Sequence, residues 1–400
     1  MNPRQPVQFC LESLLGEIPI DEFLDKYWDQ APFHCSRNDA DFYSGLVSID
    51  VIDEIISGTE LRVPSLRIVK DGVELPPDQF TSSCWNRGSR ISIFQSDLVF
   101  GAFHTGATVI FPSLDRYHYP IAEMCQMIRN SFGCVIQTNA YLTPPACGGF
   151  GAHWDNHNVL ALQVSGSKRW RVWNDPVMQL PLLSDSCPPK LGELDGEYQE
   201  ITLLQGDCLY IPRGFAHVTE AEDEPSLHLS ISISICTFSD IIKGLVDLLQ
   251  RDEIGLRKSV FLSKLADENI QDVLSKTFQR IGNKDLMQMC EELTQKTYLK
   301  QSRALVRGML AAAQYAPSIN INTLVRRRPL LKFTLRVENG WLEVRFGGRM
   351  VQFPPSIAHA LEMVISTDRP VTAVTLPIDC PLDEKLEIIK RMVLEGIMVV

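Results

Sequence analysis

The sequence lacks several features that would place it in common protein classes. Its 11 cysteines form no Cys-x-x-Cys pair and are odd in number, so neither a disulfide framework nor a zinc finger is indicated. It has no internal repeat, no low-complexity tract and no uncharged apolar run of about 20 residues that could cross a membrane. Met1 to Gln8 show no basic start followed by a long apolar run, so no secretory signal is visible. We therefore expect a cytoplasmic protein with reduced thiols.

An excess of basic residues is also missing. The 400 residues include 38 Lys and Arg against 49 Asp and Glu, a formal net charge of −11. Proteins that bind nucleic acid through its phosphates normally carry an excess of basic residues, so nucleic acid is not the expected partner. A basic protein or peptide would be attracted to such a surface. Hydrophobic residues make up 45% of the chain, enough for two or three folded units.

The first part of the chain predicts an α/β extension. Residues 9–60 are mainly helical in pattern, and from about residue 61 the pattern becomes β-like. Residues 108–111 form a short apolar strand, and Ile121 to Phe132 form an amphipathic helix that Gly133 ends.

Between Cys134 and Ser234 the pattern changes to short strands separated by turn residues. Such a run of closely spaced strands favours a barrel or jelly roll. Ser165-Gly-Ser167 predicts a tight turn that joins two of the strands into a hairpin. The predicted strands are residues 134–142, 153–164, 168–173, 203–212 and 227–235.

The last part of the chain is predicted to be helical first and mixed afterwards, which makes the whole chain α+β. Helical patterning runs from about Thr237 to Ala316. Two strands and two helices follow, at 333–337, 342–346, 355–365 and 383–395. Arg326-Arg-Arg328 could form a nucleic-acid patch, but acidic residues nearly offset basic ones from Asn320 onward, which favours an interaction or dimerisation module.

One group of residues predicts a metal site. His153 and Asp155 stand two residues apart, and on a strand such side chains point to the same face. His217 follows a strand and turn about sixty residues later and is the best candidate for a third ligand. Two histidines and one carboxylate leave open positions on an octahedral metal, as non-haem Fe(II) oxygenases require. His157 is expected to flank the site.

Lys168 predicts a buried anion partner. It shares its strand face with Trp170 and Val172, and one face of that strand must be internal. An unpaired buried ammonium is very costly, so the lysine needs an anion, unless its side chain reaches solvent from the start of the strand.

At these positions the chain resembles the cupin-type JmjC oxygenases, the group that includes the ribosomal oxygenases. The resemblance covers roughly residues 100–237. The stretches that carry it are Asn139-Ala-Tyr-Leu-Thr-Pro-Pro145, Gly151-Ala-His-Trp-Asp-Asn-His157, Leu162-Gln-Val-Ser-Gly-Ser-Lys-Arg-Trp-Arg171, Gly206-Asp-Cys-Leu-Tyr-Ile-Pro-Arg-Gly-Phe-Ala-His217 and His228-Leu-Ser-Ile-Ser232.

The resemblance implies a double-stranded β-helix (cupin or jelly-roll core) that holds Fe(II) and uses 2-oxoglutarate and O₂ as cosubstrates. Lys168 would bind the distal carboxylate of 2-oxoglutarate, with Asn139, Tyr141 and Ser232 as nearby polar contacts. It also implies an oxygenase domain over residues 1–237, a helical dimerisation region over 238–316 and a winged-helix-like domain over 317–400. A homodimer is therefore expected.

The predicted function is hydroxylation of a side chain in a protein, such as a ribosomal protein, or in a peptide, with succinate and CO₂ as by-products. Tailoring of a peptide natural product uses the same chemistry and stays open. A non-catalytic cupin is a further alternative, against which the intact ligand set and Lys168 argue. A winged-helix regulator that uses the barrel as a sensor is disfavoured by the weakly basic tail.

Overall fold

A computed structural model describes residues 9–187, 194–259, 271–272, 275–276, 279 and 307–400. The chain forms two compact units, Met1–Ser234 and Ile235–Val400. None of the helices in these described ranges is both long and apolar enough to cross a bilayer.

The first unit combines five helices with thirteen strands among its described residues. Its helices are α1 (Leu11–Leu15), α2 (Ile20–Lys26), α3 (Ile49–Gly58), α4 (Ser96–His104) and α5 (Tyr119–Phe132). Its strands are β1 (Phe33–Cys35), β2 (Arg67–Lys70), β3 (Val73–Glu74), β4 (Thr81–Asn86), β5 (Ser89–Phe94), β6 (Thr108–Phe111), β7 (Val135–Thr143), β8 (Asn158–Ser165), β9 (Lys168–Pro176), β10 (Tyr198–Leu203), β11 (Cys208–Ile211), β12 (Phe215–Ala221) and β13 (Ser226–Ser234).

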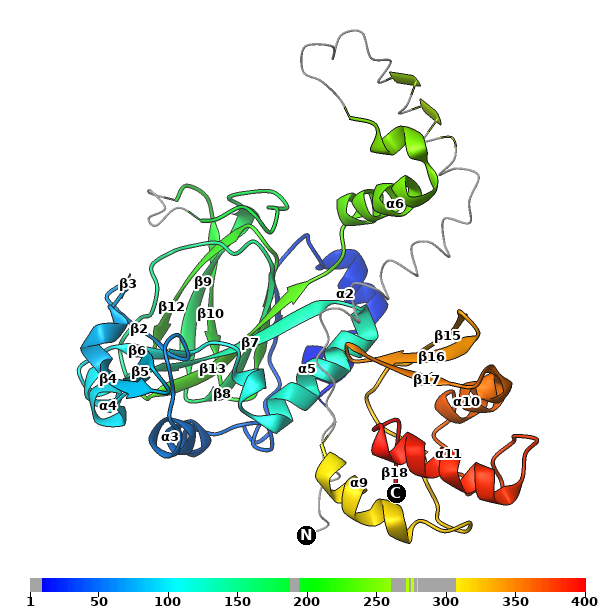
Figure 1. Cartoon of the computed structure of the whole chain (residues 1–400). Coiled ribbons are helices and arrows are strands. Elements are labelled where there is room, and N and C mark those ends of the chain that lie inside the picture. Colours follow the sequence, from blue (N-terminus) through cyan, green and yellow to red (C-terminus); the bar gives the residue numbers. More distant parts are fainter. Residues whose placement is uncertain (1–8, 188–193, 260–270, 273–274, 277–278, 280–306) are drawn as a thin grey trace. The chain divides into compact units, whose positions relative to one another are not determined.

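Two antiparallel sheets form the body of this unit (Figure 1). The larger has the strand order β1-β11-β8-β13-β7-β6-β2-β3, and the smaller has the order β10-β9-β12. Apolar side chains from both sheets share one buried cluster, to which β8 and β11 contribute from one side and β9, β10 and β12 from the other. The arrangement is the jelly roll that the strand pattern predicts.

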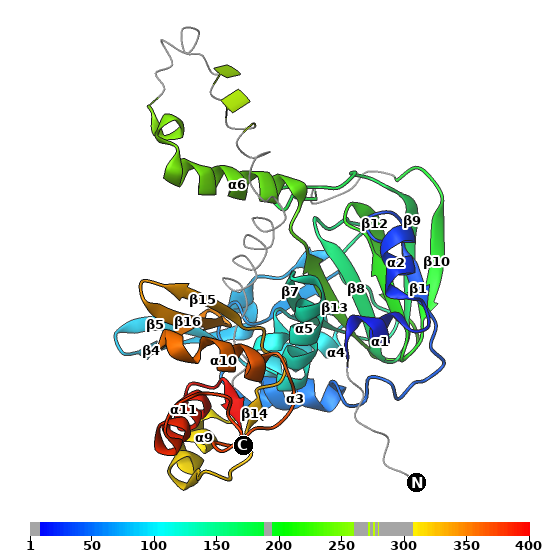
Figure 2. The same ribbon diagram turned by 90° about the vertical axis from the view of Figure 1, so that its right-hand side faces the viewer.

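Helix α5 covers part of the larger sheet and lies along β7 (Figures 1 and 2). Its predicted stop is confirmed, because Gly133 follows the helix with φ 61°, a conformation that favours glycine. The buried Cys125 thiol lies 3.0 Å from the Thr138 hydroxyl, and Arg129 donates a hydrogen bond to a β7 carbonyl. These contacts fix the strand that carries Asn139 and Tyr141.

The predicted hairpin at Ser165-Gly-Ser167 is wrong. β8 and β9 do not pair; β8 pairs with β11 and β13, while β9 pairs with β10 and β12 in the other sheet. Gly166 has φ 63°, and a Cβ atom there would lie 2.3 Å from the Pro225 carbonyl oxygen. The turn is therefore a tight corner between sheets that only glycine fits.

The predicted strand over residues 153–164 begins later than expected. β8 starts at Asn158, and His153 makes only an isolated bridge to His217. The alternation of a regular strand therefore does not explain the nearness of His153 and Asp155. A loop segment, tied to β12 at His153, brings them together instead.

The second unit is described in its first helix and its last part. It contains helices α6 (Phe238–Asp252), α9 (Met309–Tyr315), α10 (Ala358–Ile365) and α11 (Leu382–Leu394) and strands β14 (Arg326–Arg327), β15 (Thr334–Glu338), β16 (Trp341–Phe346), β17 (Arg349–Phe353) and β18 (Met398–Val399). β15, β16 and β17 form an antiparallel sheet whose apolar side chains share one core with α10 and α11. The predicted helical stretch of 238–316 lies largely outside the described residues.

Two of the three arginines at 326–328 form hydrogen bonds or ion pairs within this unit. Arg328 is buried and donates hydrogen bonds to the carbonyls of Gly396 and Arg307. Arg327 forms an ion pair of 2.9 Å with Asp368. Only Arg326 is fully exposed, so the run does not present a cluster of three free cations.

Candidate metal centre

Three side chains predicted to hold a metal meet in the first unit. The ligand atoms of His153, Asp155 and His217 all lie within 4.8 Å of one another. Asp155 Oδ2 lies 3.6 Å from His217 Nε2, and the two imidazole centroids are 4.4 Å apart. His153 and Asp155 come from the loop before β8, and His217 comes from β12.

Hydrogen bonds set the tautomers of both imidazoles. His153 Nδ1 lies 2.9 Å from the carbonyl oxygen of Gly151, and His217 Nδ1 lies 3.2 Å from that of Phe215. A carbonyl oxygen can only accept, so each Nδ1 carries the hydrogen and each Nε2 keeps its lone pair. Both lone pairs are available to a cation beside the Asp155 carboxylate, and the donor set suits a divalent transition metal.

The charge states favour a cation as well. Burial, and then the neighbouring His153, lowers the pKa of His217 to about 4, so this imidazole is neutral at neutral pH. Burial alone would raise the pKa of Asp155, but the imidazoles of His217, His157 and His153 bring it below its usual value. The site therefore offers the neutral imidazole of His217 and the carboxylate of Asp155.

A cavity of about 730 Å³ opens over these three residues. Its wall includes all the residues predicted to contact the cosubstrate: Asn139, Tyr141, Lys168 and Ser232. The cavity lies between the two sheets, since β7 and β13 line one side and β9 and β12 the other.

Lys168 is 1% exposed at the base of this cavity, and its predicted strand parity is confirmed because Trp170 and Val172 are buried with it. Its ammonium donates to the Thr143 hydroxyl at 2.9 Å and lies 3.4 Å from His228 Nδ1. Among the described residues no carboxylate forms an ion pair with it. Burial lowers the pKa of Lys168 to about 7. The geometry suits an anion at this point.

Sequence reasoning missed Thr143 and His228. Both lie beside Lys168 because β7 and β13, neighbours in the larger sheet, face β9 of the smaller sheet. The His228 ring stacks on Tyr141 with a centroid distance of 4.8 Å. Burial raises the pKa of Tyr141 to about 12, so its hydroxyl stays protonated.

His157 lies beside the three metal-ligand candidates and outside their group, as expected. The Asn156 amide nitrogen donates to the carbonyls of Leu183 and Asp185, which leaves its Oδ1 to accept from His157 Nδ1 at 3.0 Å. His157 Nε2 then accepts from the Ser232 hydroxyl at 2.8 Å. Ser232 can therefore offer the cavity an acceptor, but its proton is engaged.

Asn139 also has its carbonyl oxygen occupied. That oxygen accepts from the Ser113 amide and from the Gln137 side chain, each at 3.0 Å. The Asn139 amide nitrogen is the part of this side chain left to donate toward a ligand in the cavity.

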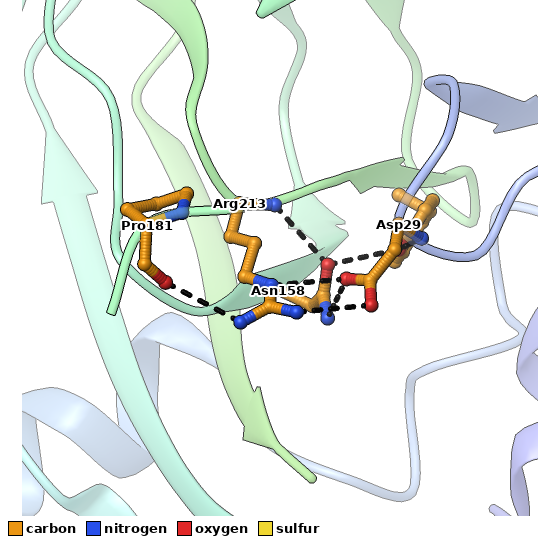
Figure 3. A network of polar contacts seen from close by, with 5 residues as sticks. Asp29, Asn158, Pro181 and Arg213 are labelled. Atoms are coloured by element: carbon orange, nitrogen blue, oxygen red, sulfur yellow. Dashed lines mark hydrogen bonds and ion pairs between the residues drawn. The ribbon is translucent and has the colours of Figure 1, made fainter. Parts of the chain in front are cut away.

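A partly buried polar network holds the two segments that carry the metal-ligand candidates (Figure 3). Arg213 donates to both carboxylate oxygens of Asp29 at 3.2 Å and to the carbonyl of Pro181 at 3.3 Å. Asn158 donates to Asp29 and accepts from the Arg213 backbone amide. The next amide, Gly214, donates to the Asp155 carbonyl at 2.8 Å. The network thereby joins the start of β8 to the turn before β12.

Comparison with known proteins agrees with this geometry. The family model of the JmjC domain matches residues 116–241. The chain is 31% identical to the "bifunctional lysine-specific demethylase and histidyl-hydroxylase NO66" of Drosophila grimshawi over 56% of this chain and 30% of that protein. It is 25% identical to "ribosomal oxygenase 1" of Danio rerio over 68% of this chain and 50% of that protein. The chain thus spans a third to a half of these curated relatives.

Among solved structures, the fold is similar to that of the ribosomal oxygenase YcfD of Escherichia coli. One structure of that protein gives a TM-score of 0.54 at 18% identity and covers 96% of this chain and 98% of that one. Another, in complex with cobalt and 2-oxoglutarate, gives 0.55 at 17% identity with the same coverage. Residues 116–241 therefore match the JmjC domain, and the fold is similar to the cupin fold of a ribosomal oxygenase.

Proposed function

We propose that this protein is an Fe(II)- and 2-oxoglutarate-dependent dioxygenase that hydroxylates a side chain of a protein substrate. The proposal rests on two features of one cavity, the three metal-ligand candidates and the buried lysine. His153, Asp155 and His217 present two lone pairs and a carboxylate to a single point, and buried Lys168 lines the same cavity with no carboxylate partner among the described residues. Relatives named as oxygenases support the same chemistry.

Each residue has a defined part in this proposal. His153, Asp155 and His217 would hold Fe(II), which supplies O₂ activation together with 2-oxoglutarate when bound. Lys168 and the Thr143 hydroxyl would receive the distal carboxylate, and the Asn139 amide would donate to it or to the substrate. The buried walls of β9 and β13 would exclude bulk water from the reacting centre.

A relative whose name includes histidyl-hydroxylase makes histidine the first target residue to test. A protein substrate with basic character suits the net charge of −11. We also propose that residues 238–316 mediate homodimerisation. Residues 317–400 would form a winged-helix-like interaction module. The protein would be cytoplasmic and would not bind nucleic acid. Phe238, Ile242 and Val246, exposed at four-residue spacing on α6, support the dimer.

The oligomeric prediction is checked by light scattering during gel filtration. We expect a particle of twice 45.1 kDa, and charge introduced by Ile242→Asp should shift it toward the single chain. A wild-type mass of one chain would contradict the proposed dimer.

Succinate formation tests the enzymatic proposal. Purified protein with Fe(II), ascorbate, O₂ and 2-oxoglutarate should produce succinate slowly without substrate, and a chelator should stop it because the metal carries the oxygen chemistry. Proteins from cells with and without this gene should differ by the mass of one oxygen on a target residue. A chain that produces no succinate and changes no target mass would contradict the proposal.

A further inference from the structure

A second cavity of about 450 Å³ adjoins the cavity over His153, Asp155 and His217, which is called the metal cavity below. The two share six lining residues, so they are contiguous: Asp71, Gly72, Gly149, Phe150, Gly151 and Thr219. The second cavity continues over the outer part of β9 and β12, where Arg169 and Glu220 line it. A ligand longer than one side chain can therefore extend from the first cavity into the second.

The boundary between the cavities is made largely of backbone. The segment 147–153 is tied to β12 at both ends, since Ala221 N donates to the Cys147 carbonyl and His217 N to the His153 carbonyl, each at 2.8 Å. Between these ties the chain carries three glycines. A Cβ atom on Gly151 would meet no atom within 4 Å. Gly151 is exposed, so an extended polypeptide can approach the backbone at this point.

Most charges on the rim of the two cavities are paired within the protein. Arg67 forms two hydrogen bonds with Glu74, at 3.0 and 2.6 Å. Arg169 pairs with Glu220 at 2.7 Å. Arg171 pairs with Glu200 at 3.0 Å. These three arginines are therefore not available to attract an anionic ligand.

Asp71 is different, because no hydrogen bond or ion pair to its carboxylate occurs in the described part of the chain, and it lines both cavities. The preceding Lys70 donates instead to the Thr105 carbonyl and lines neither cavity. The carboxylate of Asp185, on the rim of the first cavity, accepts the backbone amide of Leu182 and no other hydrogen bond from the residues that the structure describes. The unbalanced charge on the rim is negative.

The local backbone explains an aspartate or asparagine at position 71 but not the charge. Asp71 and Gly72 have φ of 51° and 77° and join β2 to β3, whose flanking residues Lys70 and Val73 pair directly. This is a two-residue hairpin turn in which asparagine serves as well as aspartate. The carboxylate at this turn is exposed, so a cation from outside the chain can reach it.

We propose that the second cavity receives the residues beside the modified one in the polypeptide substrate, and that Asp71 pairs there with a lysine or arginine of that substrate. This inference rests on the proposed function, which brings the modified side chain into the metal cavity. Because Asp71 lines both cavities, the basic residue would stand near the modified residue in the substrate sequence. Asp71 would then select among sequences without touching the metal or the cosubstrate.

Peptide binding tests this inference. The probes are two pools of short labelled peptides, random at the central position, that carry either lysine and arginine or glutamate and aspartate at the flanking positions. Their affinities are measured by fluorescence anisotropy with Co(II) and 2-oxoglutarate under nitrogen, where no turnover occurs. The variants are Asp71→Asn, which keeps the turn, and Asp223→Asn, an exposed aspartate that lines neither cavity.

We expect the basic pool to bind the wild type and Asp223→Asn equally, and to bind Asp71→Asn about three- to fivefold more weakly, as for one exposed ion pair. The difference should shrink at high salt. Equal binding of the two pools, equal binding by wild type and Asp71→Asn, or no binding of either pool would overturn the inference. If the wild type still forms succinate without peptide, the proposed function survives that failure; if it forms none, the proposed function fails separately.

Discussion

Asp155→Ala is expected to lower the affinity for Co(II) by more than about 100-fold and to stop succinate formation. Loss of an outer partner of a metal ligand costs about 10- to 100-fold, so loss of the only anionic ligand should cost more. Asp155 lies 3.6 Å from His217 and raises the pKa of that imidazole. Its removal leaves His217 still more firmly neutral, so protonation of His217 cannot be the cause of the lost affinity.

The measurement is titration with Co(II), followed by the visible absorption of the bound ion. Asp223→Ala, which removes an exposed carboxylate in the turn between β12 and β13, is the matched control and should bind as the wild type does. Retention of wild-type Co(II) affinity by Asp155→Ala would place the metal elsewhere and remove the basis of the enzymatic proposal.

Lys168→Met should raise the KM for 2-oxoglutarate about 100-fold, equivalent to about 3 kcal/mol. The methionine keeps the apolar contacts of the lysine stem with the β9 face but cannot pair with a carboxylate. Lys168→Arg should recover most of the lost affinity, because a guanidinium also binds carboxylates. The KM of each variant is measured from the rate of succinate production at a series of 2-oxoglutarate concentrations. Unchanged KM in Lys168→Met would mean that the diacid binds at another point.

The same lysine predicts a pH dependence. Burial lowers the pKa of Lys168 to about 7, and an anion bound beside it would raise that pKa. Binding of 2-oxoglutarate would then take up a proton above pH 7. The KM for 2-oxoglutarate should therefore be constant below pH 7 and rise by up to about tenfold per pH unit above it. In Lys168→Arg this rise should disappear, since arginine does not titrate there. An identical pH profile in the wild type and Lys168→Arg would assign the titration to another group.

The strand alternation of β9 could be predicted from sequence because it depends only on local periodicity. Lys168, Trp170 and Val172 share a face, and the burial of all three confirms it. The helix α5 and its glycine stop were predictable for the same reason. Signals of this kind need no knowledge of distant neighbours.

The predictions from sequence that were wrong or incomplete concern contacts between distant parts of the chain. A serine-glycine-serine turn between two strands fits a hairpin and a corner between sheets equally well, and only the close approach of Gly166 to Pro225 decides for the corner. Thr143 and His228 were missed because their nearness to Lys168 depends on strand order. The convergence of His153 and Asp155 was expected for a regular strand, whereas a loop tied to β12 produces it.

The position of Asp29 in the polar network bears on where this domain can be cut. The JmjC match begins at residue 116, yet Asp29 holds the arginine of the turn before β12, and β1, β2, β3 and β6 of the larger sheet also precede that residue. A fragment that starts at the family boundary would expose two new sheet edges and lose a counter-charge for Arg213. The smallest fragment that folds on its own therefore has to include the helices and strands that precede residue 116.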